Sequence, residues 1–211
     1  DNNDIECSIG ECDFNEQVLR TKKSNKFDGS AYSVNYNYNG RHVSIWAGYH
    51  DIDPDFRGDL GFMDEVDLNK LVIGGGYTWI GEKDDVWVRQ GVNGDWDITH
   101  NDAGEVLERE LQLFYHISGP MQSFFNTGCI YRERVGNRWD GRSLAINNNT
   151  DMFKENSCEM YVEARPVSGL FMGLYAETGK EIDYDNNRLG DATVFVPRIN
   201  YSFNKHLRLE Y

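Results

Sequence analysis

The segment that decides the fold is residues 31–51, AYSVNYNYNGRHVSIWAGYHD. Its first half alternates apolar and polar residues, and Asn39-Gly40 is then the dipeptide most typical of a two-residue β-turn. The alternation resumes after the turn, which predicts an amphipathic β-hairpin and not a helix. One face of this hairpin carries Tyr32, Val34, Tyr36, Tyr38, Val43, Ile45, Ala47 and Tyr49.

The same period of two continues along the chain. We expect about ten strands, at residues 31–38, 41–51, 70–80, 86–98, 105–117, 121–134, 151–166, 170–180, 191–202 and 206–211, and a weak strand at 14–21. The predicted fold class is therefore all-β, an up-and-down antiparallel meander in a single domain of residues 1–211. We expect residues 1–29 to form a loosely ordered lead-in.

The predicted connections alternate between short and long. Tight turns are expected at 39–40, 81–85, 118–120, 167–169 and 203–205, and longer polar connections at 52–69, 99–104, 135–150 and 181–190. In a meander this alternation places all the long loops at one end, which is typical of outer-membrane β-barrels. Strands of about 10–14 residues also suit a tilted crossing of a bilayer better than an ordinary soluble sheet. The sequence therefore predicts part or all of an outer-membrane β-barrel, either whole or an internal slice of a larger one.

The two faces of the predicted strands differ in chemistry. One face carries Val, Leu and Ile, with Tyr and Trp near the strand ends, which favours contact with lipid and its interface. The other face carries charges, and an acidic lumen would favour cations over anions. The predicted ion pairs are Arg89 with Asp95 and Asp97, and Arg208 with Glu210. Pro197 removes one ladder hydrogen bond, so we expect a β-bulge at that position.

Composition excludes some classes of partner. The net charge is −14, with 21 basic and 35 acidic residues, and so acidic a chain is a poor nucleic-acid binder. Mean hydropathy is −0.64, and no stretch approaches the ~18 apolar residues of a membrane helix. The chain opens on Asp-Asn-Asn-Asp without the features of a secretory signal, as expected of a mature product or an internal fragment.

Four cysteines permit two disulfides in three connectivities. We favour Cys7–Cys12 as a local staple and Cys129–Cys158 as a link between consecutive strands. No C-x-x-C pair or histidine cluster suggests zinc, so an oxidising compartment is the better interpretation.

One segment resembles a known bacterial family. Residues 53–67 read DPDFRGDLGFMDEVD. They resemble a segment of proteins that pair an N-terminal carbohydrate-binding module of family nine with a C-terminal outer-membrane barrel domain of unknown function. The matched positions are Pro54, Asp55, Phe56, Arg57, Leu60, Gly61, Phe62 and Asp67. This chain has Asp64-Glu65-Val66 where the family often has Pro-Arg-Thr. The resemblance implies an outer-membrane location and a slice of the barrel without the sugar-binding module.

Candidate sites are few. Asp53, Asp55 and Asp59 lie in an acidic loop at 51–67 that is either solvated or a calcium or sugar site. Glu108 and Glu110 share a face about 7 Å apart, within the range of an inverting glycosidase, although lumen carboxylates do the same by default. No nucleophile elbow or phosphate loop is visible, and Gly74-Gly75-Gly76 is better explained by bending or close approach.

The sequence therefore predicts a bacterial outer-membrane β-barrel protein that serves transport, anchoring or surface display. We expect no catalytic activity, no cofactor and no nucleic-acid partner. Outer-membrane lipid is the expected partner, with glycans or a periplasmic or surface protein as further candidates. The alternatives are a soluble carbohydrate-binding β-barrel or sandwich, with Trp87, Trp139 and Tyr184 as stacking platforms, and a glycan-processing protein.

Overall fold

The computed structural model describes residues 28–54, 56, 66–135, 152–183, 188–204 and 207–211, together with the backbone of two short strands nearer the N-terminus. These are β1 (Asp13–Phe14) and β2 (Val18–Leu19), which pair antiparallel and overlap the weak strand predicted at 14–21. The rest of the predicted lead-in, up to residue 27, lies outside the described residues.

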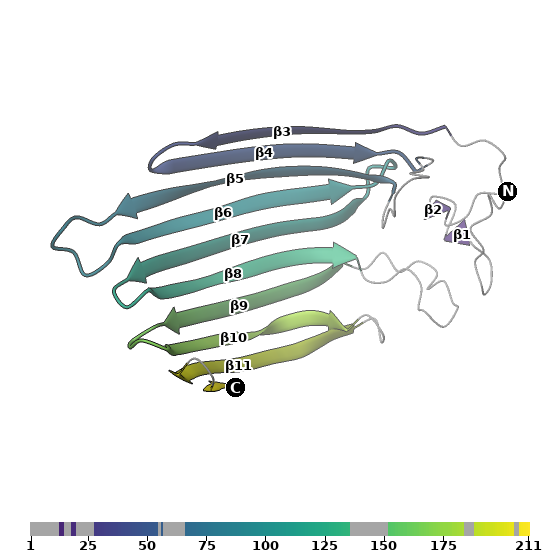
Figure 1. Cartoon of the computed structure of the whole chain (residues 1–211). Coiled ribbons are helices and arrows are strands. Elements are labelled where there is room, and N and C mark those ends of the chain that lie inside the picture. Colours follow the sequence, from purple (N-terminus) through teal and green to yellow (C-terminus); the bar gives the residue numbers. More distant parts are fainter. Residues whose placement is uncertain are drawn as a thin grey trace.

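Ten further strands form one antiparallel sheet in which each strand pairs with its neighbours in sequence (Figure 1). The sheet is open, since β3 and β12 are its two edges. The predicted all-β meander of about ten strands is thus confirmed. The strands are β3 (Ala31–Asn39), β4 (Val43–Ile52), β5 (Leu68–Ile80), β6 (Arg89–His100), β7 (Val106–Gly119), β8 (Ser123–Val135), β9 (Met152–Ala164), β10 (Leu170–Asp183), β11 (Arg188–Asn204) and β12 (Leu207–Glu210).

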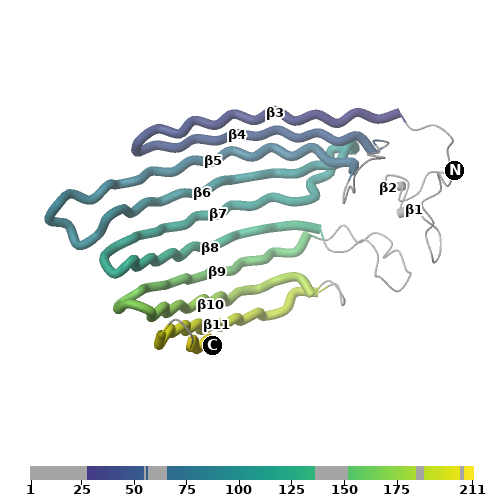
Figure 2. The backbone as a smooth tube through the Cα atoms, in the orientation of Figure 1, coloured from purple at the N-terminus to yellow at the C-terminus, as the bar shows by residue number. Residues whose placement is uncertain are grey.

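The connections divide between the two ends of the sheet (Figure 2). The strand ends that flank the two longest, 53–67 and 136–151, lie at the same end of the sheet, which we call the loop end. The opposite end is called the turn end. The predicted alternation is less regular than expected, because the turn-end connection 81–88 is longer than the loop-end connection 101–105. Val86 and Val88, predicted inside a strand, lie in that longer connection.

Pro197 does not cause the predicted bulge. It pairs in register with Leu174 of β10, and β11 shows a register shift only against β12, between Ser202 and Asn204. The amide of Ile199, two residues on, donates to Tyr211 on the β12 side. By alternation the Pro197 nitrogen points to the same side, away from β10, so the pairing with Leu174 needs no N–H at this position.

The sheet has an apolar face and a polar face. The apolar face runs from Tyr32–Tyr38 of β3 to Tyr201 of β11, and its side chains alternate with those of the polar face along every strand. Large apolar residues on this face are exposed, such as Leu111 at 52 %, Leu113 at 63 % and Phe195 at 66 %. No protein layer covers them in the described part of the chain.

Burial is concentrated on the polar face. Asp97, Thr99 and Glu155 are only 5 %, 8 % and 7 % exposed, whereas Ile182 is the one buried hydrophobic side chain among the described residues. A water-soluble β-protein shows the opposite arrangement. Within the described ranges, the structure contains no helix with the length and apolar character required to cross a bilayer.

Candidate functional site: the polar face

A network of charged side chains crosses the polar face near the loop end. Lys70 of β5 lies 3.3 Å from Asp97 of β6 and 3.5 Å from Glu108 of β7, measured from its Nζ to the nearest carboxylate oxygen. The strand register brings these residues together, because Lys70 pairs with Thr99 and Thr99 with Glu108. Three consecutive strands are therefore linked through one ammonium group.

The network continues over β8 and β9 through two arginines. Arg132 Nε donates to Glu110, and its Nη1 lies 3.7 Å from a Glu155 oxygen. Arg134 Nε lies 2.7 Å from the same oxygen. These contacts follow one register row, in which Asp97, Glu110, Arg132 and Glu155 are successive partners. We call the seven residues the charge network: Lys70, Asp97, Glu108, Glu110, Arg132, Arg134 and Glu155.

The predicted pairing of Arg89 with Asp95 and Asp97 is wrong. Arg89 lies at the turn end of β6, opposite Ile80 and Ser118, and is exposed. Asp97 pairs with Lys70, and Asp95 accepts a hydrogen bond of 2.7 Å from Gln112. Partners across neighbouring strands are closer than partners six or eight residues along one strand. The other predicted pair is confirmed, with Arg208 Nε 2.7 Å from Glu210.

Three carboxylates of the network region lie close enough to share a cation. One oxygen from each of Asp95, Asp97 and Glu110 falls within 4.8 Å of the other two. Each of them already has a partner in the sheet: Gln112, Lys70 and Arg132 respectively. Glu110 is therefore held by an arginine, and Glu108 is similarly close to Lys70.

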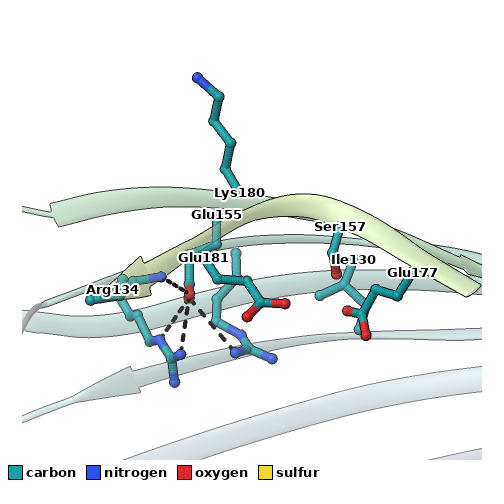
Figure 3. A pocket seen from close by; sticks show the side chains of 9 residues that line it. Ile130, Arg134, Glu155, Ser157, Glu177, Lys180 and Glu181 are labelled. Atoms are coloured by element: carbon teal, nitrogen blue, oxygen red, sulfur yellow. Dashed lines mark hydrogen bonds and ion pairs between the residues drawn. The ribbon is translucent and has the colours of Figure 1, made fainter. Parts of the chain in front are cut away.

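A hollow of about 420 Å³ lies beside the charge network, between β8, β9 and β10 (Figure 3). The carboxylate of Glu155 stands at one side of it, in contact with Arg132 and Arg134, and Ser157 and Glu177 stand at the other. The lining is thus mixed, with cationic, anionic and hydroxyl groups. Such a surface binds water and polar solutes, and it does not resemble an apolar ligand cavity.

Toward the turn end, the acids of β9 and β10 interact with tyrosines. Tyr175 donates to Glu177 at 2.6 Å and lies 3.2 Å from Glu159, and Tyr161 donates to Glu163. No ion pair to these three glutamates is present among the described residues. The charges of Arg165 and Arg198 act on Tyr161 beside Glu163, so both parts of the polar face carry charges of both signs.

The acidic loop residues that the structure describes have structural roles. Asp53 Oδ2 accepts from the Ser30 backbone N–H at 2.7 Å and from the Ser30 hydroxyl at 2.8 Å, and these bonds hold the pKa of Asp53 below its ordinary value. Asp67, at φ 62°, accepts the Asp102 N–H at 2.9 Å. Partial desolvation, followed by the charges of Asp53 and Asp51, raises the pKa of Asp102.

Several predicted site residues can now be placed. Phe56 is half-buried and donates its N–H to the Asp53 carbonyl. Trp87 is half-buried in the β5–β6 connection, and its role as a stacking platform stays a prediction. Most of the predicted calcium loop and of the matched family segment lies outside the described part of the chain. The predicted site residues that lie outside it are Cys7, Cys12, Asp55, Asp59, Leu60, Gly61, Phe62, Trp139 and Tyr184.

The predicted disulfide between Cys129 and Cys158 is confirmed. The two residues are direct register partners on β8 and β9, and their Cα atoms are 4.1 Å apart. The bond lies on the apolar face and joins the middle of β8 to the middle of β9. The close approach predicted at Gly74-Gly75-Gly76 is also seen. The Trp46 indole lies so near the Gly74 backbone that a Cβ on Gly74 would be 2.3 Å from it.

The sequence interpretation missed Lys70, Arg132, Arg134 and Glu155. The signal that could have found them is the register, which follows from the turns on either side of each strand. Comparisons with models of known protein families, with curated proteins and with solved structures find no match to this chain. The resemblance of residues 53–67 stays a prediction.

Proposed function

We propose that this chain forms a membrane-spanning β-wall, part or all of a bacterial outer-membrane β-barrel. In this proposal the apolar face contacts lipid and the polar face lines an aqueous interior. The observation that carries the proposal is the distribution of burial, with Leu113 and Phe195 exposed while Asp97 and Glu155 are buried. An apolar face of this extent is stable in water only when something covers it.

The apolar side chains of the apolar face form a band across the strands, which we call the apolar belt. The path of this belt supports a tilted membrane crossing. On β4 the belt ends toward the loop end at Tyr49, and Asp51 lies beyond it. The register row of Tyr49 leads to Arg109, Glu133 and Lys154 on β7, β8 and β9, all of which are charged. The belt therefore does not follow the register but descends toward the turn end from β4 to β11.

The register allows the tilt to be estimated. On β11 the belt ends at Phe195, whose register row leads back through seven strand pairings to Val43 of β4. Val43 is six residues from Tyr49 (49 − 43 = 6), which is about 20 Å of strand against about 34 Å of sheet width. The resulting angle is roughly 30°, close to the ~35–45° at which strands cross membranes.

The height of the belt agrees with a bilayer. On β5 it runs from Leu71 to Trp79, eight residue steps (79 − 71 = 8), or about 27 Å along the strand. At a tilt of roughly 30° this gives about 23 Å along the membrane normal, near the ~25 Å apolar band of outer-membrane barrels. Tyrosines at its borders, Tyr49 and Tyr77 among them, suit the interface with water.

The cellular role that fits such a wall is transport, anchoring or surface display. The charge network and the glutamates of β9 and β10 would set the electrostatic character of the interior and favour cations over anions. The family resemblance of residues 53–67 agrees with an outer-membrane location and with further strands in a larger barrel.

Vesicle flotation tests the proposal. The chain, refolded from denaturant in the presence of preformed phosphatidylcholine vesicles, should float with them, resist an alkaline wash and stay monomeric only in lipid or detergent. A soluble carbohydrate-binding β-protein would instead remain monomeric in detergent-free buffer and bind sugars on a glycan array. That result would contradict the membrane proposal.

A further inference from the structure

Aromatic side chains gather on the polar face closer to the turn end than the charge network. The centroids of the His116 and Phe124 rings lie 6.5 Å apart, and those of the Phe124 and Tyr161 rings lie 6.3 Å apart. The guanidinium carbon of Arg165 lies 5.2 Å from the centroid of the Phe171 ring. The rings of this region come from neighbouring register rows of β7–β10, and we call them the aromatic patch: Phe114, His116, Phe124, Tyr161, Phe171 and Tyr175.

Glycines on neighbouring strands let two of these rings lie against the sheet. Gly128 is the register partner of Phe114, and a Cβ there would collide with the Phe114 ring. Gly91 is the register partner of His116, and a Cβ there would be 2.8 Å from the imidazole. Each ring can rest on the backbone of the next strand because the residue below it has no side chain. A ring that rests on the sheet turns its other face away from the wall, and every residue of the patch is only half-buried.

The charged side chains around the aromatic patch balance one another in sign. One register row contains Arg89, Phe124, Glu163 and Arg198, and Glu159 and Glu177 are partners in another. Three carboxylates and three guanidiniums therefore surround the rings: Glu159, Glu163, Glu177, Arg89, Arg165 and Arg198. Among the residues that the structure describes, none of the six takes part in an ion pair.

Most of the hydrogen-bonding capacity of these six groups is not used within the sheet. Tyr161 and Tyr175 each donate one hydrogen bond to a glutamate, and Arg165 donates one to Gln122 at 3.1 Å. A carboxylate can accept about four hydrogen bonds, and a guanidinium can donate about five. The rings are thus bordered by both donors and acceptors, with no excess of either charge.

We propose that the aromatic patch binds an uncharged saccharide in the interior of the wall. This inference deepens the proposed function and rests on it, because the polar face lines an interior only in that proposal. A sugar ring has an apolar C–H face that packs on an aromatic ring, and each of its hydroxyls both donates and accepts hydrogen bonds. Rings bordered by equal numbers of carboxylates and guanidiniums supply all three kinds of contact. A ligand with a net charge would meet as many repelling groups as attracting ones.

Sugar binding by the vesicle-bound chain tests the inference. The chain is refolded in phosphatidylcholine vesicles, floated, and titrated with maltohexaose, cellohexaose and xylohexaose, with empty vesicles as the blank. We expect at least one of these uncharged oligosaccharides to bind, and we expect saturation transfer from the aromatic protons of the protein to be strongest at the C–H protons of the sugar. Oligogalacturonate and spermine serve as charged probes. Binding of a charged probe alone, or no binding of any of the three oligosaccharides, would overturn the inference.

Two adjacent phenylalanines on opposite faces supply a matched pair of variants. Phe124 belongs to the aromatic patch, whereas Phe125 lies on the apolar face and pairs with Ile117 and Val162. Phe124→Leu keeps the apolar bulk but removes the ring, so the oligosaccharide should bind about tenfold more weakly. Phe125→Leu should leave the affinity unchanged. Equal affinities in the original chain and in Phe124→Leu would refute the stacking role. If Phe124→Leu does not fold, Phe171→Leu should give the same loss, and an unchanged affinity there would count equally against the inference.

Flotation and binding separate the two proposals. A chain that does not float contradicts the membrane location. A floated chain that binds none of the three oligosaccharides contradicts only the saccharide site.

Discussion

The apolar face offers a direct energetic test through a single arginine. Leu113 lies near the centre of the belt on β7, between Arg109 at one border and Gly119 at the end of the strand, and is 63 % exposed. In water, a substitution at so exposed a site changes the free energy of unfolding by about 0.5 kcal/mol or less. In lipid, an arginine at mid-depth costs about 2–4 kcal/mol. Leu113→Arg therefore separates the two environments.

A second substitution on the same strand supplies the control. Leu107 lies beyond Arg109 toward the loop end, six residues from Leu113 (113 − 107 = 6) and about 17 Å from it along the membrane normal at the estimated tilt. Leu107→Arg should cost only about 0–1 kcal/mol, because the side chain lies outside the apolar belt. Both values come from guanidinium titrations of vesicle-bound protein followed by tryptophan fluorescence. Equal losses at the two positions, or a loss below 0.5 kcal/mol at Leu113, would refute lipid contact.

Three further predictions concern the polar face, the disulfide and the loop end. Arg132→Met should lower the free energy of unfolding by about 2 kcal/mol or more, because Glu110 and Glu155 lose a shared cation. The control Arg109→Met breaks an exposed pair with Glu133 and should cost at most about 1 kcal/mol. Equal losses in the two variants would contradict the role of the charge network. Reduction of the Cys129–Cys158 disulfide, which joins residues 29 apart in sequence, should lower the free energy of unfolding by about 3–4 kcal/mol, because the unfolded chain gains the entropy of the opened loop. Denaturant titrations with and without reductant measure this difference. An unchanged free energy of unfolding would contradict the loop-entropy explanation. The Asp53 pKa is lowered in the folded state, so its contribution is full above the unfolded-state pKa of about 4 and is lost as pH falls through the lower folded-state value. Ser30→Ala removes the hydroxyl bond and keeps the backbone N–H bond, so it should partly flatten the acid limb of the stability–pH curve. An unaltered limb would show that the hydroxyl bond does not contribute to the lowered pKa of Asp53.

Much of the fold could be predicted because its signal is local. The alternation in residues 31–51 and the Asn39-Gly40 turn define β3 and β4 almost to the residue. The Cys129–Cys158 disulfide could be predicted for the same reason, since the two residues are equidistant in sequence from the centre of the β8–β9 connection. Local patterns failed where the chain leaves the sheet but keeps the alternation of apolar and polar residues. Val86–Val88 were predicted as strand for this reason, although they lie in the 81–88 connection.

The site could be predicted less well, because its contacts depend on register. Arg89 was matched with Asp95 and Asp97 along one strand, whereas Asp97 meets Lys70 across the β5–β6 ladder. A pairing error of one residue would move either side chain to the opposite face. The Glu155–Ile182 bond depends on where the β9–β10 ladder stops, and no sequence pattern marks that point.

The most direct test of the membrane-wall proposal is tryptophan quenching by lipids with brominated acyl chains. Trp96 lies on the apolar face and Trp46 on the polar face, over Gly74. Single-tryptophan variants that retain one or the other, with the remaining tryptophans replaced by phenylalanine, report each face separately. We expect strong quenching of Trp96 and little quenching of Trp46. Strong quenching of Trp46 with little at Trp96, or none at either position in floated vesicles, would contradict the assignment of the apolar face to lipid.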